Sequence, residues 1–165
     1  MEIVNNIEWY FSDPKDAIIR DTMKKITKKQ LKTVVLKKIT KNQLKTVVFD
    51  DSVKENVKFT FPLNDYLTVT ETRELPRPIT VEQLLTFVHK VYHETLTQEI
   101  IDKSFGKNED LKKEWMDEMI ECYNDCDITH LKKLDLFDNT CTPDFCGIQL
   151  SEEDPNEYFI EIGPE

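Results

Sequence analysis

Glycine and arginine are scarce in this 165-residue chain, which has three of each against nineteen lysines. Three glycines in separate contexts (Gly106, Gly147 and Gly163) cannot build a glycine-rich phosphate loop. The sequence also lacks the Gly-x-Ser-x-Gly and His-Glu-x-x-His signatures of hydrolases and zinc proteases. With no catalytic motif to support an activity, we predict that the protein is not an enzyme.

Long apolar runs are absent as well. No run approaches the ~20 apolar residues that span a bilayer, and the N-terminal sequence MEIVNNIEWYFSDP lacks the apolar region of a secretory signal. We therefore expect a protein that is neither secreted nor membrane-spanning, with its four cysteines reduced. A content of 39% hydrophobic and 33% charged residues is typical of a globular domain, and the length suffices for one compact core.

The net charge of −10 is unevenly distributed. The segment from Lys24 to Lys58 contains eleven lysines and three acidic residues, a balance of +8, so the rest of the chain carries −18. An acidic body of this kind repels nucleic acid and anionic membranes. Nucleic-acid binding would therefore have to use the basic segment.

The basic segment contains a duplication. Residues 24–36, KKITKKQLKTVVL, are followed at 37–49 by KKITKNQLKTVVF. In one continuous helix, a shift of thirteen residues would rotate one copy by about 220° relative to the other, so the two apolar sets would not share a face. A hairpin is favoured, with strands at Leu31–Thr40 and Gln43–Phe49 and a tight turn at Lys41-Asn42. A short lysine-rich helix in each copy is the alternative.

The lysines of the duplication are the candidates for phosphate contact. They alternate with Thr, Val, Ile and Leu instead of aromatic residues that stack on bases, and the segment has no arginine for base readout. A scaffold role, as a hairpin added to an N-terminal sheet, is therefore favoured over nucleic-acid binding. The candidate lysines are Lys24, Lys25, Lys28, Lys29, Lys32, Lys37, Lys38, Lys41 and Lys45.

Helical patterns occupy the middle of the chain. Thr80-Val-Glu-Gln83 is a capping box, and the apolar residues after it recur at helical spacing. Thr97 and Asn108 are the expected N-caps of two further helices. The stripe of the first helix consists of Val81, Leu84, Leu85, Val88, Val91 and Tyr92.

Strand patterns lie on both sides of these helices. Alternation or β-branched composition predicts strands near Ile7–Phe11, at Val57–Phe61, Tyr66–Thr72, Phe145–Leu150 and Tyr158–Ile162. Strands, then helices, then strands predict an α+β fold in which N-terminal antiparallel strands, central helices and a C-terminal strand pair share one domain. We divide it into a strand-rich part, 1–75, with the duplication at 24–49, and a helical and C-terminal hairpin part, 76–165.

The four cysteines are the candidate metal ligands. Cys122, Cys126, Cys141 and Cys146 could supply four thiolates to a structural zinc ion. Their spacings, x3 and x4, differ from the x2 of zinc knuckles. Reduced cysteines are therefore favoured, and Cys146, which lies in an apolar strand, is expected to be part of the hydrophobic core. No cofactor is predicted. A zinc-stabilised domain is the alternative.

His89 and His93 lie one helical turn apart, a spacing that can clamp a metal ion. Two ligands alone make an incomplete site, and no third ligand can be singled out among thirty-two acidic residues. Surface or half-buried histidines are therefore the favoured interpretation.

Two stretches resemble uncharacterised proteins of large amoeba-infecting DNA viruses of the mimivirus type. They are residues 78–103, PITVEQLLTFVHKVYHETLTQEIIDK, and residues 145–163, FCGIQLSEEDPNEYFIEIG. The resemblance implies a viral origin, a small α+β domain, and a place in the host cytoplasm or the virion. It implies no catalytic residues. The lysine-rich, arginine-poor composition is typical of the AT-rich genomes of such viruses.

These observations favour a non-enzymatic viral protein that acts through protein–protein contacts with a viral or host partner. A nucleic-acid-associated protein using segment 24–58 and a zinc-stabilised domain are the alternatives. The exposed edges of the predicted strands also leave a homodimer open.

Overall fold

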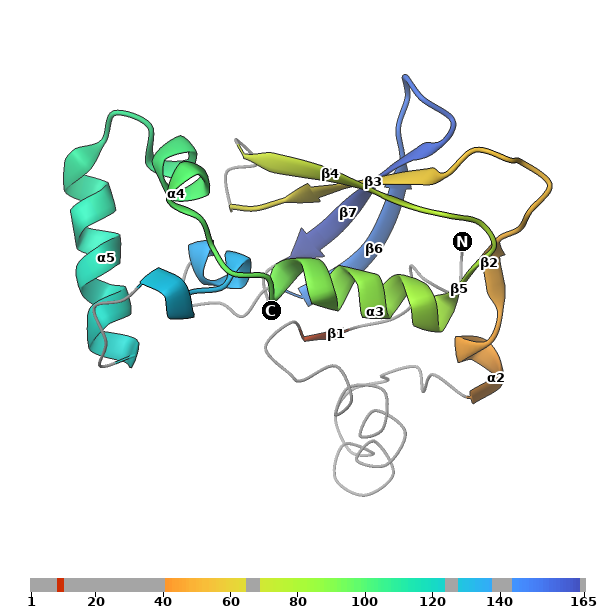
Figure 1. The fold of residues 1–165 in the computed structure, drawn as a ribbon, viewed down its shortest axis with the longest axis horizontal. Coiled ribbons are helices and arrows are strands. Elements are labelled where there is room, and N and C mark those ends of the chain that lie inside the picture. The colour runs from red at the N-terminus through yellow and green to blue at the C-terminus, as the bar shows by residue number, and fades with distance from the viewer. Residues whose placement is uncertain (1–8, 11–40, 65–68, 124–127, 138–143, 164–165) are drawn as a thin grey trace.

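A computed structural model describes residues 9–10, 41–64, 69–123, 128–137 and 144–163 of the chain (Figure 1). The α+β prediction is confirmed, since antiparallel strands come first, helices follow, and a strand pair closes the fold. The elements are β1 (Trp9–Tyr10), α2 (Lys41–Leu44), β2 (Val47–Phe49), β3 (Val57–Pro62), β4 (Thr70–Leu75), β5 (Ile79–Thr80), α3 (Val81–Tyr92), α4 (Gln98–Phe105), α5 (Glu109–Tyr123), the 3-10 turns η2 (Ile128–His130) and η3 (Lys133–Leu136), β6 (Asp144–Leu150) and β7 (Glu157–Gly163).

The main sheet has five strands in the order β1-β6-β7-β3-β4. Its pairs are antiparallel except for β3 and β7, which run parallel. This parallel pair joins a strand from the first half of the chain to the last strand. The strands expected at Val57–Phe61, Phe145–Leu150 and Tyr158–Ile162 are confirmed, and β4 confirms the end of the one expected at Tyr66–Thr72.

Helix α3 covers one face of this sheet, which we call the inner face (Figure 1). The predicted capping box starts the helix: the Thr80 hydroxyl accepts from the Gln83 amide at 3.2 Å, and the Thr80 amide donates to the Gln83 side chain at 2.8 Å. Every residue of the predicted apolar stripe is buried. The stripe therefore faces the sheet, as its helical spacing predicts.

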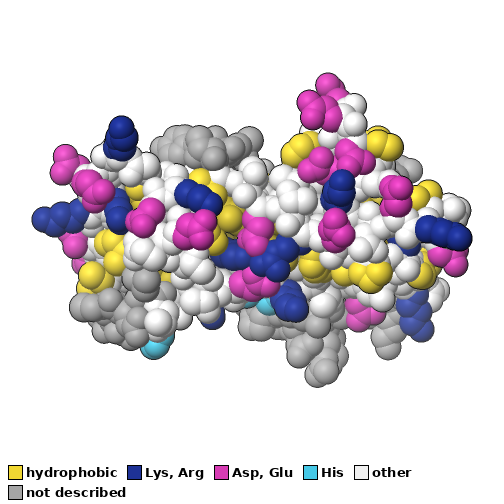
Figure 2. Space-filling view, turned by 45° about the horizontal axis from the view of Figure 1, so that its top comes forward, with side chains coloured by type: hydrophobic (Ala, Val, Ile, Leu, Met, Phe, Trp, Pro, Cys, Tyr) yellow, Lys and Arg dark blue, Asp and Glu magenta, His cyan; other side chains and the backbone are white. Residues whose placement is uncertain are grey.

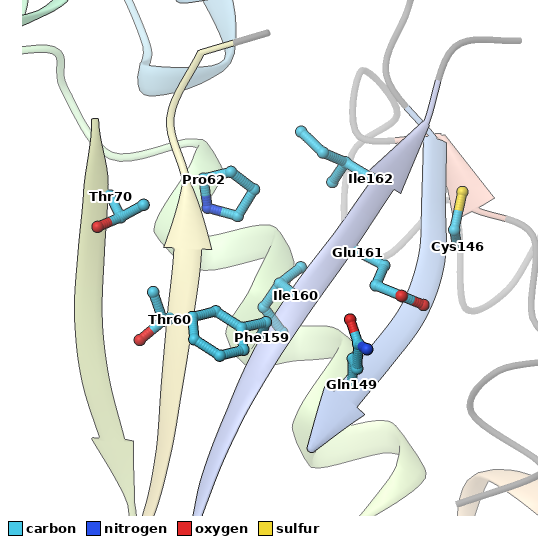
Figure 3. A pocket seen from close by; sticks show the side chains of 9 residues that line it. All are labelled: Thr60, Pro62, Thr70, Cys146, Gln149, Phe159, Ile160, Glu161 and Ile162. Atoms are coloured by element: carbon cyan, nitrogen blue, oxygen red, sulfur yellow. The ribbon is translucent and has the colours of Figure 1, made fainter. Parts of the chain in front are cut away.

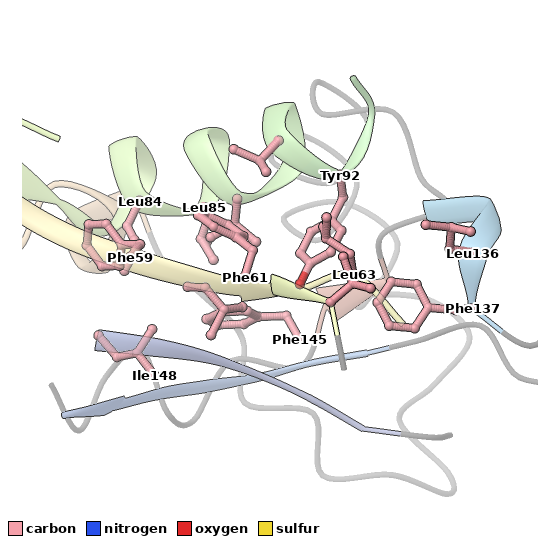
Figure 4. Close-up of a cluster of buried hydrophobic side chains, with 14 of the residues drawn as sticks. Phe59, Phe61, Leu63, Leu84, Leu85, Tyr92, Leu136, Phe137, Phe145 and Ile148 are labelled. Carbon is pink, nitrogen blue, oxygen red and sulfur yellow. The ribbon is translucent and has the colours of Figure 1, made fainter. Parts of the chain in front are cut away.

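Aromatic rings fill the space between α3 and the inner face (Figure 4). Phe61 on β3 packs edge-on against Phe87 and Tyr92 of α3, with ring centroids 5.6 and 5.7 Å apart. Tyr92 donates its hydroxyl to the carbonyl of Pro62 at 2.8 Å. Burial raises the pKa of Tyr92 well above its ordinary value, so the hydroxyl remains a donor.

Helices α4 and α5 extend beyond the end of the sheet (Figure 1). Both predicted N-caps are confirmed, because the Thr97 hydroxyl accepts from the Ile100 amide and the Asn108 side chain accepts from the Leu111 amide. Trp115 anchors α5 by donating its indole N–H to the carbonyl of Asp135 at 3.1 Å. The helical extension is thus tied to the segment that contains η3.

In the second copy of the duplication, the predicted turn is wrong, and the predicted strand Gln43–Phe49 is confirmed only at its end, Val47–Phe49. Lys41–Leu44 forms α2, as in the alternative prediction, and the strand begins only at Val47. Leu44 is buried, which favours a helical turn that directs it to the core. Strand β2 then pairs with β5 in a separate two-stranded sheet. Leu31–Thr40 lies outside the described residues.

None of the helices in the described part of the chain combines the length and apolar character that crossing a bilayer requires.

Candidate functional site

The face of the main sheet opposite α3, which we call the outer face, carries the candidate site. Because side chains alternate along a strand, the residues between the core phenylalanines of β3 point to this face. Thr60 lies there on β3, and Phe159 and Glu161 lie there on β7 (Figure 3). Phe159 is 41% exposed, whereas its neighbour Ile160 on the inner face is 2% exposed.

A groove of about 600 Å³ lies on the outer face. Its apolar lining residues include Phe159, Pro62 and the two β7 isoleucines, and Glu161 is its one charged lining residue (Figure 3). A partly apolar groove with few polar groups is a common form of binding site. Its lining consists of Thr60, Pro62, Thr70, Cys146, Gln149, Phe159, Ile160, Glu161 and Ile162.

Cys146 contributes to this groove, which corrects the prediction that it lies in the core. Strict alternation from the buried Ile148 would turn Cys146 inward. A register shift between Phe145 and Gly147 instead lets Phe145 face the core and leaves Cys146 exposed. Gly147 permits the irregularity, because its φ of 149° is accessible mainly to glycine.

Hydrogen bonds between side chains make the centre of the outer face rigid. The hydroxyls of Thr60 and Thr72, on neighbouring strands, lie 2.8 Å apart. Thr60 also donates to the carboxylate of Glu157 on β7 at 2.7 Å. These bonds link three adjacent strands across the face, so a partner would meet a preorganised surface.

The hairpin of β6 and β7 is strongly acidic, and its projecting tip shows a cluster of acidic side chains (Figure 2). Within the described part of the chain, one lysine forms an ion pair with this hairpin: Lys58 contacts Asp154 at 2.8 Å. The ammonium of Lys58, and then the Asn156 amide, lower the pKa of Asp154. Residues 144–163 contain no Lys or Arg and six acidic residues, Asp144, Glu152, Glu153, Asp154, Glu157 and Glu161.

A second group of charged side chains lies on the inner-face side of β4. Lys133, only 3% exposed, contacts the carboxylates of Glu71 and Glu94, and Arg73 contacts the same two carboxylates. Burial favours the protonated form of Glu71, but Lys133 and Arg73 outweigh it and lower its pKa. This cluster ties β4 to the end of α3 and to η3. No local motif marks it, since its members are far apart in the sequence.

The two histidines on α3 do not converge on a metal position. Their rings stack with centroids 3.8 Å apart and an angle of 12° between the planes, so the in-plane lone pairs run nearly parallel. Nδ1 of His93 also lies 2.9 Å from the carbonyl of His89. His93 is half-buried, in agreement with the favoured interpretation, whereas His89 is buried, so that interpretation is wrong for His89.

The predicted zinc and nucleic-acid sites fall largely outside the described residues. Of the four cysteines, only Cys146 has a described side chain, and no metal-binding group of three His, Cys, Asp or Glu residues occurs among the side chains that are described. Of the nine lysines, only Lys41 and Lys45 fall in a described segment; Lys41 lies in α2 and Lys45 is exposed. Both sites stay predictions.

Comparisons of the chain with protein-family models, curated proteins and solved structures found no match. The resemblance to proteins of amoeba-infecting viruses therefore stays a prediction, as do the viral origin and the location that it implies.

Proposed function

We propose that the protein is a non-enzymatic binding domain whose outer sheet face receives a lysine-rich, extended segment of a partner protein. The observation that carries this proposal is the groove of about 600 Å³ beside the acidic β6–β7 hairpin. The groove offers apolar contact through Phe159, and the hairpin offers carboxylates. Aromatic residues are enriched in protein interfaces, and complementary charge accelerates association and selects the partner.

The charge of this face favours a basic protein segment over nucleic acid. Glu157 and Glu161 lie on the outer-face side of β7, and Lys58, the nearest lysine on β3, is paired with Asp154. Phosphates would be repelled by these carboxylates. An extended segment suits the groove, because its long, flexible lysine side chains can reach Glu157 and Glu161 while apolar groups of the segment contact Phe159.

Affinity for a defined peptide tests the proposal. The probe is a peptide of alternating lysine and valine, and a peptide of alternating glutamate and valine is its control, both titrated calorimetrically at low and physiological salt. We expect saturable binding of the lysine peptide, weakened by salt, and none of the glutamate peptide. Glu161→Lys should weaken binding about fivefold, which corresponds to about 1 kcal/mol.

The matched control is Glu118→Lys, which makes the same charge change at an exposed position of α5. It should leave the affinity within about twofold, since only general attraction is reduced there. Equal weakening by the two variants, or no binding at low salt, would overturn the proposal.

A further inference from the structure

Among the described strands, β4 forms one edge of the main sheet. It is the last strand of the main sheet, and β3 is its only partner among the described strands. The amide of Leu63 donates to the carbonyl of Val69 at 2.9 Å, which makes these residues a hydrogen-bonded pair. In an antiparallel ladder such pairs alternate with non-bonded ones. Pro62, which has no N–H, accordingly lies in a non-bonded position opposite Thr70.

This alternation determines which backbone groups face away from β3. They are those of Thr70, Thr72 and Glu74, whose side chains are all exposed. No backbone hydrogen bond between these groups and another described segment is present. The edge therefore presents three residues that can each exchange hydrogen bonds with an added strand.

We propose that β4 pairs antiparallel with β4 of a second copy of the chain, with the two-fold axis at Thr72. In this register Thr72 lies opposite Thr72 of the other copy, and Thr70 lies opposite Glu74. All outward-facing backbone groups then meet their equivalents as hydrogen-bonded pairs. The two main sheets become one continuous sheet.

The side chains of β4 are self-complementary in this register. Glu71 lies opposite Arg73 of the second copy, and Arg73 lies opposite its Glu71. Val69 lies opposite Leu75, so apolar residues also meet. These pairs occupy the non-bonded positions, where cross-strand side chains approach most closely. In this register no like charges lie directly opposite each other. Like-charged side chains at these positions would oppose pairing of the two edges.

Symmetric registers with the axis two residues away lose part of this pairing. Moving the axis to Glu74 places Pro76 opposite Thr72, and proline cannot donate to the ladder. Moving it to Thr70 leaves Glu74 beyond the end of the described partner strand. The register centred on Thr72 is thus the one that uses all of β4.

The charged cluster of Glu71, Arg73, Glu94 and Lys133 supports the same register. Arg73 already contacts Glu71 and Glu94 of its own chain, at the inner side of the edge. In the dimer, the two clusters lie next to each other across the two-fold axis, with each Glu71 opposite an Arg73 of the other copy. The inference does not depend on the proposed partner, because dimerisation needs only the β4 edge.

A six-residue strand supplies a small interface. Interfaces below about 1,200 Å² are generally weak, so we expect a dissociation constant on the order of 100 μM. The dimer should therefore be absent in dilute solution and populated at millimolar protein.

Sedimentation equilibrium across this concentration range provides the first test. The wild-type mass should rise from that of a monomer towards that of a dimer. Thr72→Pro should stay monomeric, because it removes an outward N–H while leaving the β3 ladder intact; circular dichroism verifies its fold. Thr72→Val, which keeps the backbone donor, should dimerise within about threefold of wild type.

Cysteine crosslinking provides the second test, and it reads the register directly. Thr72→Cys should form a 72–72 disulfide, since hydrogen-bonded antiparallel pairs have Cα atoms about 5.5 Å apart, within disulfide range. Thr70→Cys is the matched control, with its two copies about 13 Å apart along the strands. Peptide mapping separates these bonds from those of native cysteines. A wild-type monomer at every concentration, or equal crosslinking at positions 70 and 72, would overturn the inference.

Discussion

The two faces of the main sheet are made by the same strands and have opposite characters. On the inner face, Phe59, Phe61 and Phe145 are fully buried beneath α3 and its neighbours. On the outer face, Phe159 is 41% exposed and the hydroxyls and carboxylates of Thr60, Thr72 and Glu157 bond to one another. Burial explains the composition of the inner face. On the outer face, the exposed Phe159 lines the groove from which we propose binding.

Replacing a phenylalanine on each face should give the largest contrast in stability. Phe61→Ala leaves a cavity among Phe87 and Tyr92, and we expect it to lower the free energy of unfolding by about 4 kcal/mol. Phe159→Ala should lower it by about 1 kcal/mol or less, because its ring already meets water. Urea denaturation measures both. Similar losses from the two variants would show that the faces do not differ as described.

The buried lysine offers the next contrast, between an enclosed ion pair and an exposed one. Lys133→Met leaves two partly exposed carboxylates with Arg73 alone, and we expect a loss of about 2 kcal/mol, between the values for buried and surface pairs. Lys103→Met removes a solvent-exposed pair with Glu99 and should cost less than about 0.5 kcal/mol. Thermal unfolding compares the two, and equal losses would contradict the structural role given to the cluster.

The start of α3 should contribute less. Thr80→Ala removes the hydroxyl that accepts from Gln83, and we expect a loss of about 1 kcal/mol in the free energy of unfolding. Thr80→Ser keeps an oxygen in the same place and should be nearly neutral. If both variants lose the same amount, the threonine methyl group rather than the cap stabilises the helix.

The smallest expected effect is a pH dependence at the cluster. Lys133 and Arg73 hold the pKa of Glu71 below its ordinary value of 4.5 despite burial. A lowered folded-state pKa gives stability that is present above 4.5 and lost as the pH falls through the folded-state value. Glu71→Gln should therefore be less stable at neutral pH and lose less on acidification. If the stability of Glu71→Gln falls with decreasing pH as steeply as that of the wild type, Glu71 is not the source of this pH dependence.

Local patterns predicted the elements that local interactions stabilise. The capping box at Thr80 and the stripe after it are enough to place α3 against a sheet, and the alternation at Val57–Phe61 is enough to identify β3. Burial of Leu44 in the core favours the short helix α2. Helix and strand propensities alone do not indicate this burial.

The candidate site depends on longer-range geometry. Pairing of β3 with β7 brings Thr60 beside Glu157, ninety-seven residues away. The register shift that exposes Cys146 has one local signal, a glycine within an apolar strand, which indicates a bulge. The Lys133 cluster joins residues from β4, the end of α3 and η3, and no periodicity connects these positions.

Mapping of the bound peptide by NMR tests the central claim most directly. Backbone amide shifts are followed while the alternating lysine–valine peptide is added to the wild-type chain. The account predicts that the largest changes occur at Gln149, Phe159 and Glu161, with small ones at Met119 and Ile120 on α5. Largest changes on α5, or changes spread evenly over all acidic surfaces, would contradict a binding site on the outer face.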